Sequence, residues 1–139
     1  KTFENGSSAE IFEKMVFHLG GNVNFLERVN IELPKAPLVE DIYCSSSGYV
    51  NLIDATAIGM AVLELGGARR RSDDTIDHAV GFENLLGVKD RVDSHTPLGT
   101  VHARDLESLH KAKSMLVGAY KIDVKKSKKD NPLVIEQID

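Results

Sequence analysis

Several features are scarce in this chain of 139 residues, and each scarcity excludes a class of protein. The chain has a single cysteine, Cys44, so it cannot form an internal disulfide, and we expect a reducing, cytoplasmic setting. No apolar run approaches the roughly 18 residues that a membrane span needs, so we predict no contact with a membrane. The chain has 17 basic and 21 acidic residues, and its net charge of −4 argues against nucleic acid as a partner.

Motifs that carry chemistry are missing as well. None of the five histidines lies in a metal-ligand pattern with cysteine or carboxylate, so we predict no metal site. The serines at positions 45–47 lack the G-x-S-x-G setting of a nucleophile, and there is no Walker-type glycine loop. The pair Gly66-Gly67 follows a predicted helix, and the negative end of that helix would repel phosphate. The residues alone therefore predict no catalytic residue and no cofactor.

What is present is the composition of one soluble domain, with 42% apolar and 27% charged residues. Apolar residues with helical spacing predict four helices. A capping box of Ser7 and Glu10 begins the first helix, and Asp54 and Asp105 cap the last two. Small residues such as Gly59 should let the third helix pack closely on a sheet. We expect the helices at Ser7–Leu19, at Val23–Val29, at Ala55–Leu65 and from Asp105 to Ala119.

Short apolar runs between turn residues predict β-strands. The stretch Arg91–Ala103 is expected to form a hairpin around a His95-Thr96-Pro97 turn. We therefore predict an α/β fold, α+β-like, with a mixed β-sheet and flanking helices. The other strands are expected at Leu38–Tyr43, at Tyr49–Ile53, at Val80–Val88 and, as a closing edge strand, over Leu133–Ile138.

The most charged segment is Ala68–His78, which holds three arginines and three aspartates. It lies between two apolar elements, so it should be an exposed loop. In one interpretation its charges pair with one another, which contributes little stability. In the other it borders a cleft, and Arg69, Arg70, Asp74 and Asp77 are then candidate substrate-binding residues. The residues alone leave both interpretations open.

Five groups of segments, read in order, resemble the C-terminal domain of the pyrimidine-nucleoside phosphorylase family. The resemblance runs from about Gly6 to Ile138, and residues 58–81 look most like the bacterial thymidine phosphorylases within that family. The matching segments are Gly6–Met15 with Leu19–Gly21, Leu33–Ala36, Gly48–Val50 with Ile53-Asp54 and Ile58–Ala61, Leu65–Arg70 with Asp74–Asp77 and Val80-Gly81, and Pro97–Ala103.

The resemblance implies that this chain is about the last third of a homodimeric, cytoplasmic enzyme. Enzymes of the family convert thymidine and phosphate to thymine and 2-deoxyribose 1-phosphate. Their phosphate loop and base-binding segment come earlier in the chain, so the N-terminal portion of the same enzyme should be the partner that binds thymidine and phosphate. We expect residues 1–36 to be a helical lead-in segment from the parent α/β domain and residues 37–139 to be the C-terminal domain. The isolated chain should be inactive, and the loop should help to close the cleft.

Two positions depart from the family pattern. Family members commonly have Gly-Asp where this chain has Lys89-Asp90, and they have glycine where it has His95. Glycine adopts left-handed backbone angles without strain, whereas other residues do so at a cost. We therefore expect different turn geometry at these two positions.

Two alternative functions remain open. Residues 88–103 also resemble a biotinyl or lipoyl carrier domain, which implies a barrel-like hairpin subdomain within the fold. Those carriers place a modified lysine just after this point, where this chain has Arg104, and a guanidinium cannot be acylated in its place. The second alternative is a stand-alone interaction module with one exposed apolar patch.

Overall fold

The computed structural model describes residues 4–127, and the chain divides into two compact units, Lys1–Lys35 and Ala36–Asp139. We describe each unit by itself. The closing strand predicted over Leu133–Ile138 lies outside the described residues.

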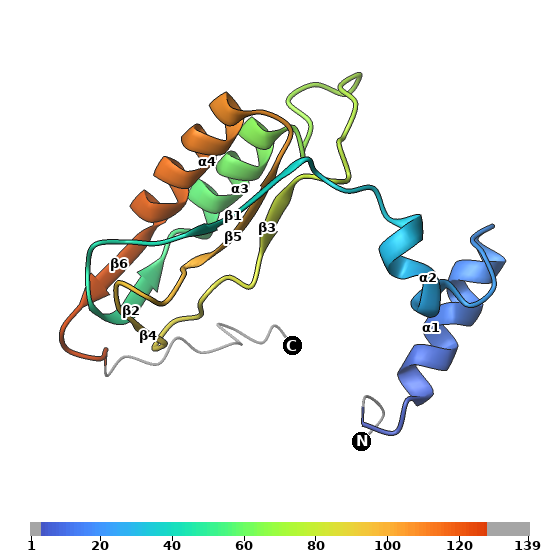
Figure 1. Cartoon of the computed structure of the whole chain (residues 1–139), viewed down its shortest axis with the longest axis horizontal. Coiled ribbons are helices and arrows are strands. Elements are labelled where there is room, and N and C mark those ends of the chain that lie inside the picture. The colour runs from blue at the N-terminus through green and yellow to red at the C-terminus, as the bar shows by residue number, and fades with distance from the viewer. Residues whose placement is uncertain (1–3, 128–139) are drawn as a thin grey trace, which may run out of the picture. The chain divides into compact units, whose positions relative to one another are not determined.

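The first unit is a pair of helices, α1 (Ser7–His18) and α2 (Phe25–Glu32) (Figure 1). The predicted capping box is wrong, because Gly6, with a φ of 79°, is the N-cap of α1, and the side chain of Asn5 accepts the Ser7 amide at 3.1 Å. Ser7 is already the first helical residue, and its hydroxyl instead donates to Oδ1 of Asn5 at 2.8 Å. The second helix begins two residues later than predicted and continues to Glu32.

Up to residue 127, where the described part of the chain ends, the second unit contains two three-stranded sheets, and every strand pair within them is antiparallel. One sheet has the order β1-β5-β3 and the other β4-β2-β6, so consecutive strands alternate between the sheets. The strands are β1 (Leu38–Ile42), β2 (Gly48–Ile53), β3 (Gly81–Glu83), β4 (Arg91–Val92), β5 (Gly99–Ala103) and β6 (Tyr120–Asp123).

The hairpin predicted over Arg91–Ala103 is therefore wrong. Its two arms exist as β4 and β5, but β4 pairs with β2, whereas β5 pairs with β1 and β3. The amide of Leu98 donates to the carbonyl of Ile42 at 2.7 Å, and this contact leads the chain onto β1. Leu98 is fully buried, so burial of its side chain favours that path over a local turn back to β4.

Two helices lie side by side on one side of the strands, α3 (Ala55–Leu65) and α4 (Leu106–Ala119) (Figure 1). Both predicted caps are confirmed. The side chain of Asp54 accepts a hydrogen bond from the Ala57 amide at 2.9 Å, and Asp105 accepts one from the Ser108 amide at 2.8 Å. Each aspartate thereby satisfies a backbone donor that has no partner within its helix.

One hydrophobic core joins both sheets to both helices. The predicted combination of helices and strands is confirmed, although the strands form two antiparallel sheets and do not close into a barrel. The phenol of Tyr120 donates to the Leu86 carbonyl at 2.9 Å, and no buried side-chain polar atom in residues 4–127 lacks a partner. The fully buried core side chains include Ile42, Val50, Val92, Leu98, Val101, Leu109 and Leu116.

The strand β6 was not predicted, and the chain after it is held by a side chain. Asn51, at an irregularity in the pairing of β2 with β6, donates to the Lys125 carbonyl and accepts from the Ser127 amide, both at 2.8 Å. Beside it, the ammonium of Lys126 lies 5.6 Å from the ring centroid of Tyr49. Among residues 4–127, no helix is both long and apolar enough to cross a membrane.

Candidate functional site

The most charged loop of the chain follows helix α3, and we call residues 66–78 the arginine loop. Gly66 ends α3 with a φ of 90°, a left-handed conformation that glycine adopts without steric cost. The carbonyl of the same residue accepts a hydrogen bond from the Asp77 amide at 3.0 Å. This bond brings the two ends of the loop together, so the loop projects from a closed base.

The near side of the arginine loop is held by two carboxylates. Arg70 forms an ion pair with Glu64 on α3, and Glu64 is also bound by Lys111 from α4. The side chain of Glu64 is only 18% exposed. Its hydrogen bond from Lys111 and the charge of Arg70 outweigh the effect of this burial and hold the pKa of Glu64 below its ordinary value.

The second carboxylate is Asp74, within the loop. Its Oδ2 accepts the backbone amides of Arg70 at 2.8 Å and of Arg71 at 2.9 Å. The amide of Asp74 in turn donates to the Arg71 carbonyl at 3.2 Å. The two accepted hydrogen bonds, led by that from Arg71, lower the pKa of Asp74. Asp74 therefore organises the backbone of the loop and stays ionised at neutral pH.

The far end of the loop is fixed by Asp77. Arg104, which lies between β5 and α4, donates to both of its carboxylate oxygens, at 2.5 and 3.0 Å. The Ala79 amide also donates to Asp77, at 3.0 Å. Led by the Arg104 hydrogen bond, these contacts lower the pKa of Asp77 from 3.8 to about 2. A bidentate arginine–carboxylate pair also fixes the direction of both side chains.

The structure thus gives the four candidate residues different roles. Arg70, Asp74 and Asp77 are engaged in holding the loop, whereas Arg69 is exposed and makes no ion pair with any described residue. The side chain of Arg71 is also exposed, and it too makes no ion pair with any described residue. The interpretation of the loop as self-paired is corrected, because its side-chain ion pairs reach outside the loop to Glu64 and Arg104.

Sequence reasoning missed Glu64, Lys111 and Arg104. The pairing of Arg104 with Asp77 spans 27 positions and that of Lys111 with Glu64 spans 47, so no local spacing signals either. The only local signal was for Arg70 and Glu64, six residues apart across the end of α3. The two distant pairs could be found only after the folded arrangement of the chain was known, which for Lys111 and Glu64 is the packing of α3 on α4.

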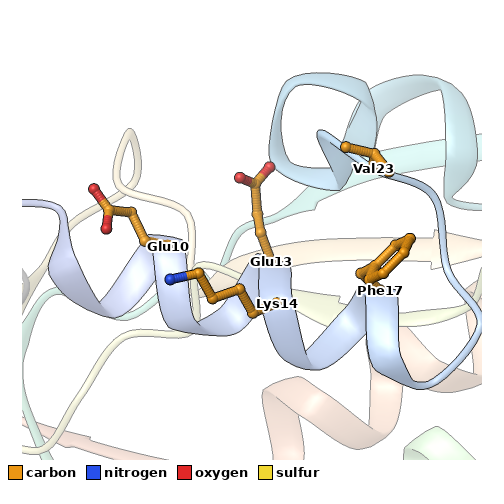
Figure 2. A pocket seen from close by; sticks show the side chains of 5 residues that line it. All are labelled: Glu10, Glu13, Lys14, Phe17 and Val23. Carbon is orange, nitrogen blue, oxygen red and sulfur yellow. The ribbon is translucent and has the colours of Figure 1, made fainter.

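Two hollows in the surface include no residue of the arginine loop. The larger, about 480 Å³, lies in the helical unit and is lined by four residues of α1 and by Val23 in the segment that follows (Figure 2). Of the lining carboxylates, Glu13 already accepts the Leu26 amide at 3.1 Å. Phe17 and Val23 supply an exposed apolar lining. We interpret this hollow as part of an uncovered packing surface, since it brings no set of convergent polar groups together.

The histidines and the potential metal ligands bear on the predicted absence of a metal site. No group of three or more histidine, cysteine, aspartate or glutamate side chains there is arranged to hold a metal ion. His102 lies 3.1 Å from a carboxylate oxygen of Glu83 on the neighbouring strand β3, a cross-strand pair at the surface. His95 does not have the left-handed backbone expected where the family has glycine, but Lys89 does, with a φ of 76°.

The family model for the pyrimidine nucleoside phosphorylase C-terminal domain matches residues 49–123, which is more than half of the chain. The match runs from β2 to β6 and includes the whole arginine loop, together with its partners Glu64, Arg104 and Lys111. It begins after β1, although β1 pairs with β5 along its full length. The chain therefore belongs to the pyrimidine nucleoside phosphorylase C-terminal domain family.

Proposed function

We propose that this chain is the C-terminal part of a thymidine phosphorylase and helps to close the substrate cleft of that enzyme. The parent enzyme transfers 2-deoxyribose from thymidine to phosphate, and the groups that bind these substrates belong mainly to its N-terminal portion. The observation that carries the proposal is the arginine loop. It is an exposed loop with three arginines, held in place by ion pairs, within the segment matched by the family model.

Closure of such a cleft needs an element that keeps its shape while it meets substrate. The arginine loop has that property, because Glu64 holds one side of it and Arg104 the other. Excluding water strengthens the electrostatic contacts that stabilise the transition state in which phosphate attacks the sugar and the base leaves. The proposal therefore gives the loop a role in closing the cleft and leaves the reacting groups to the N-terminal portion.

The helical unit supports the same proposal through its exposed apolar side chains. Neither α1 nor α2 buries a single residue, although both are amphipathic. Residues this apolar are ordinarily covered, so we propose that the N-terminal portion of the parent covers them. The exposed large apolar side chains of the unit are Ile11, Phe12, Met15, Phe17, Leu19, Val23, Leu26, Ile31 and Leu33.

The carrier-domain alternative is weakened by the structure. A carrier would need a hairpin with a lysine just after Ala103, but here β5 leads directly to the cap of α4. Arg104 at that point donates two hydrogen bonds to the carboxylate of Asp77. The stand-alone interaction module keeps one supporting observation, which is the apolar surface of the helical unit.

The test is a phosphorolysis assay that follows thymine release from thymidine and phosphate. The chain is assayed alone, then with a separately produced N-terminal portion of the parent enzyme. The proposal is supported if the chain alone releases no thymine and the mixture of the two portions does. Turnover by the chain alone would show that it carries catalytic residues, which overturns the proposal. Silence of the mixture, when the two portions bind each other, would favour the interaction module.

Substrate preference is tested in the same mixture by comparing thymidine with uridine. A thymidine phosphorylase should show a higher kcat/KM for thymidine, while equal values would indicate a broader pyrimidine nucleoside phosphorylase. Protection of the helical unit from hydrogen exchange on mixing tests the proposed packing surface. Unchanged exchange in α1 and α2 would rule it out.

A further inference from the structure

We infer that the arginines of the loop divide their work, with Arg69 and Arg71 binding an oxyanion from outside the chain and Arg70 acting as the positioning residue between them. The inference rests on the proposed function and deepens it. It assigns the contact to two side chains and removes Arg70, a sequence-predicted binding residue, from direct contact.

Arg70 makes contacts within the chain through both its side chain and its backbone amide. Its guanidinium pairs with Glu64, which is 18% exposed and is held in turn by Lys111. Its backbone amide donates to Asp74. The contact engages Nη2 of the guanidinium and directs the side chain toward Glu64, although 58% of the side chain stays exposed and other donors of the group remain. Arg70 is therefore less available to a ligand than an arginine without an ion pair.

The same contacts fix the backbone on both sides of Arg70. The Arg71 amide shares Oδ2 of Asp74 with the Arg70 amide, and Gly66 and Asp77 close the base of the loop. The loop backbone is thus ordered before any ligand arrives. Preorganisation of this kind lowers the entropy that binding must overcome.

The ordered loop leaves the side chains of Arg69 and Arg71 exposed to solvent. Both are exposed, and neither has an ion-pair partner among residues 4–127. The nearby carboxylates Glu64 and Asp77 are bound by Arg70, Lys111 and Arg104, while Asp74 accepts two backbone amides. These three carboxylates are therefore engaged, whereas Asp73 of the same loop is exposed and forms no ion pair with any residue from 4 to 127, so it is the one loop carboxylate left to meet the outer arginines.

The ligand that fits is an oxyanion. Guanidinium groups bind carboxylate and phosphate through two parallel hydrogen bonds, which an ammonium cannot reproduce. In the proposed enzyme that oxyanion has two possible sources, the inorganic phosphate of the reaction or a carboxylate on the N-terminal portion that meets the loop when the cleft closes. Both share the same chemistry, and the kinetic experiment separates them.

The first experiment uses the chain alone and measures hydrogen exchange of the Arg71 amide by NMR. Arg70→Ala and Glu64→Gln should accelerate this exchange at least tenfold, because both remove the pair that holds the loop. Arg69→Ala should leave it unchanged, and so should Lys113→Ala, a matched control that removes the remote pair with Glu40. Equal acceleration by Arg69→Ala and Arg70→Ala would overturn the division of roles.

The second experiment measures thymidine phosphorolysis by the chain mixed with the N-terminal portion. Loss of one charge-assisted contact at Arg69 should reduce kcat/KM by about tenfold to a hundredfold. Arg69→Lys should recover little of this loss, whereas Arg70→Lys should behave almost like the unsubstituted chain because an ammonium can still pair with Glu64. If phosphate is the oxyanion, the loss appears in its KM. If a carboxylate is the oxyanion, the two portions bind more weakly and kcat falls.

Failure of the inference and failure of the proposed function give different results. An unsubstituted mixture without activity, whose two portions still bind each other, overturns the proposed function and with it the assignment of an oxyanion. An active mixture that is unaffected by the Arg69→Ala/Arg71→Ala double variant overturns the inference alone. Recovery by Arg69→Lys equal to that by Arg70→Lys would also overturn it, because the bidentate contact would then be unnecessary.

Discussion

The close approach of β2 to β6 makes Gly48 the position where a single methyl group should be most damaging. A Cβ built on Gly48 would lie 2.3 Å from the Asp123 carbonyl oxygen and 2.7 Å from the Asp123 carbonyl carbon, below the 3.0 Å that real Cβ contacts keep. Both atoms belong to the backbone of β6, so no side chain can rotate away. The φ of 156° adds strain for any residue with a side chain.

The expected cost of Gly48→Ala follows from these two effects. Overpacking costs about 1–3 kcal/mol, and backbone strain of this kind costs a further ~1–3 kcal/mol. We expect the free energy of unfolding to fall by about 2–6 kcal/mol, a large share of the roughly 5–15 kcal/mol of an ordinary domain. Urea unfolding followed by far-ultraviolet circular dichroism measures this change through the transition midpoint.

Gly59→Ala is the matched control, since the same methyl group there enters open space. Gly59 is exposed near the middle of α3, and nothing lies within 4 Å of the position that an alanine methyl group would take. This variant should be stabilised by about 0.5–1 kcal/mol, the usual gain of alanine over glycine in a helix. Surface substitutions usually change the free energy of unfolding by no more than about 0.5 kcal/mol. A change of that size in the Gly48→Ala variant would refute the close pairing of β2 with β6.

Three further predictions concern a turn, the core and an ion pair. Lys89→Gly should raise the free energy of unfolding by about 0.5–1 kcal/mol in the same urea assay, because the φ of 76° strains a lysine and not a glycine. Leu109→Ala should lower it by about 2–5 kcal/mol, since Leu109 is fully buried and the change leaves a cavity; a smaller loss would show that the core collapses around it. A carbon-13 NMR titration of the Asp77 carboxyl should give a midpoint about 2, so that its ion pair stabilises the fold above the ordinary pKa of 3.8 and is lost as the pH falls toward 2. Arg104→Gln should return that midpoint toward 3.8, and an unchanged midpoint would contradict the assigned cause.

Local signals in the sequence were enough for the helices that carry the core. Asp54 and Asp105 each act on a backbone amide three residues away, so their capping role is written in a few adjacent positions. The same kind of reasoning failed for Ser7 and Glu10. There the glycine before Ser7 takes the cap position, and that choice depends on backbone angles that the capping pattern does not encode.

Strand partners could not be predicted in the same way. Alternation of apolar residues indicates which face of a strand is buried but not which strand lies beside it. The hairpin over Arg91–Ala103 was the shortest connection available, yet Leu98 is buried in the shared core and its amide donates to Ile42 at the end of β1. Among the small residues of α3 that were expected to allow close packing, Ala61 is fully buried and Ala57 packs against the core, whereas Ala55 and Gly59 are exposed.

The candidate site was predicted in part. Composition marked the charged loop as the candidate site, which stays a prediction. The roles proposed for Arg69 and Arg70 rest on Glu64, whose ion pair with Lys111 exists only in the folded chain. A cluster of like residues in a loop marks where contacts occur. Which arginine pairs within the chain and which is proposed to bind a ligand depends on ion pairs between residues distant in sequence.

The alternation of strands between the two sheets has a consequence for how the chain acquires its structure. Among the strands within residues 4–127, none pairs with the next one along the chain, and β1 must wait for β5, its Leu38 facing Ala103. Folding is slower when contacts are distant in sequence, because the intervening chain must be closed first. During synthesis, β1 therefore stays unpaired until β5 has left the ribosome, and the sheet β4-β2-β6 completes only with β6. We expect this domain to fold late and in one step, so a chain that stops before Tyr120 should be cleared as unfolded protein.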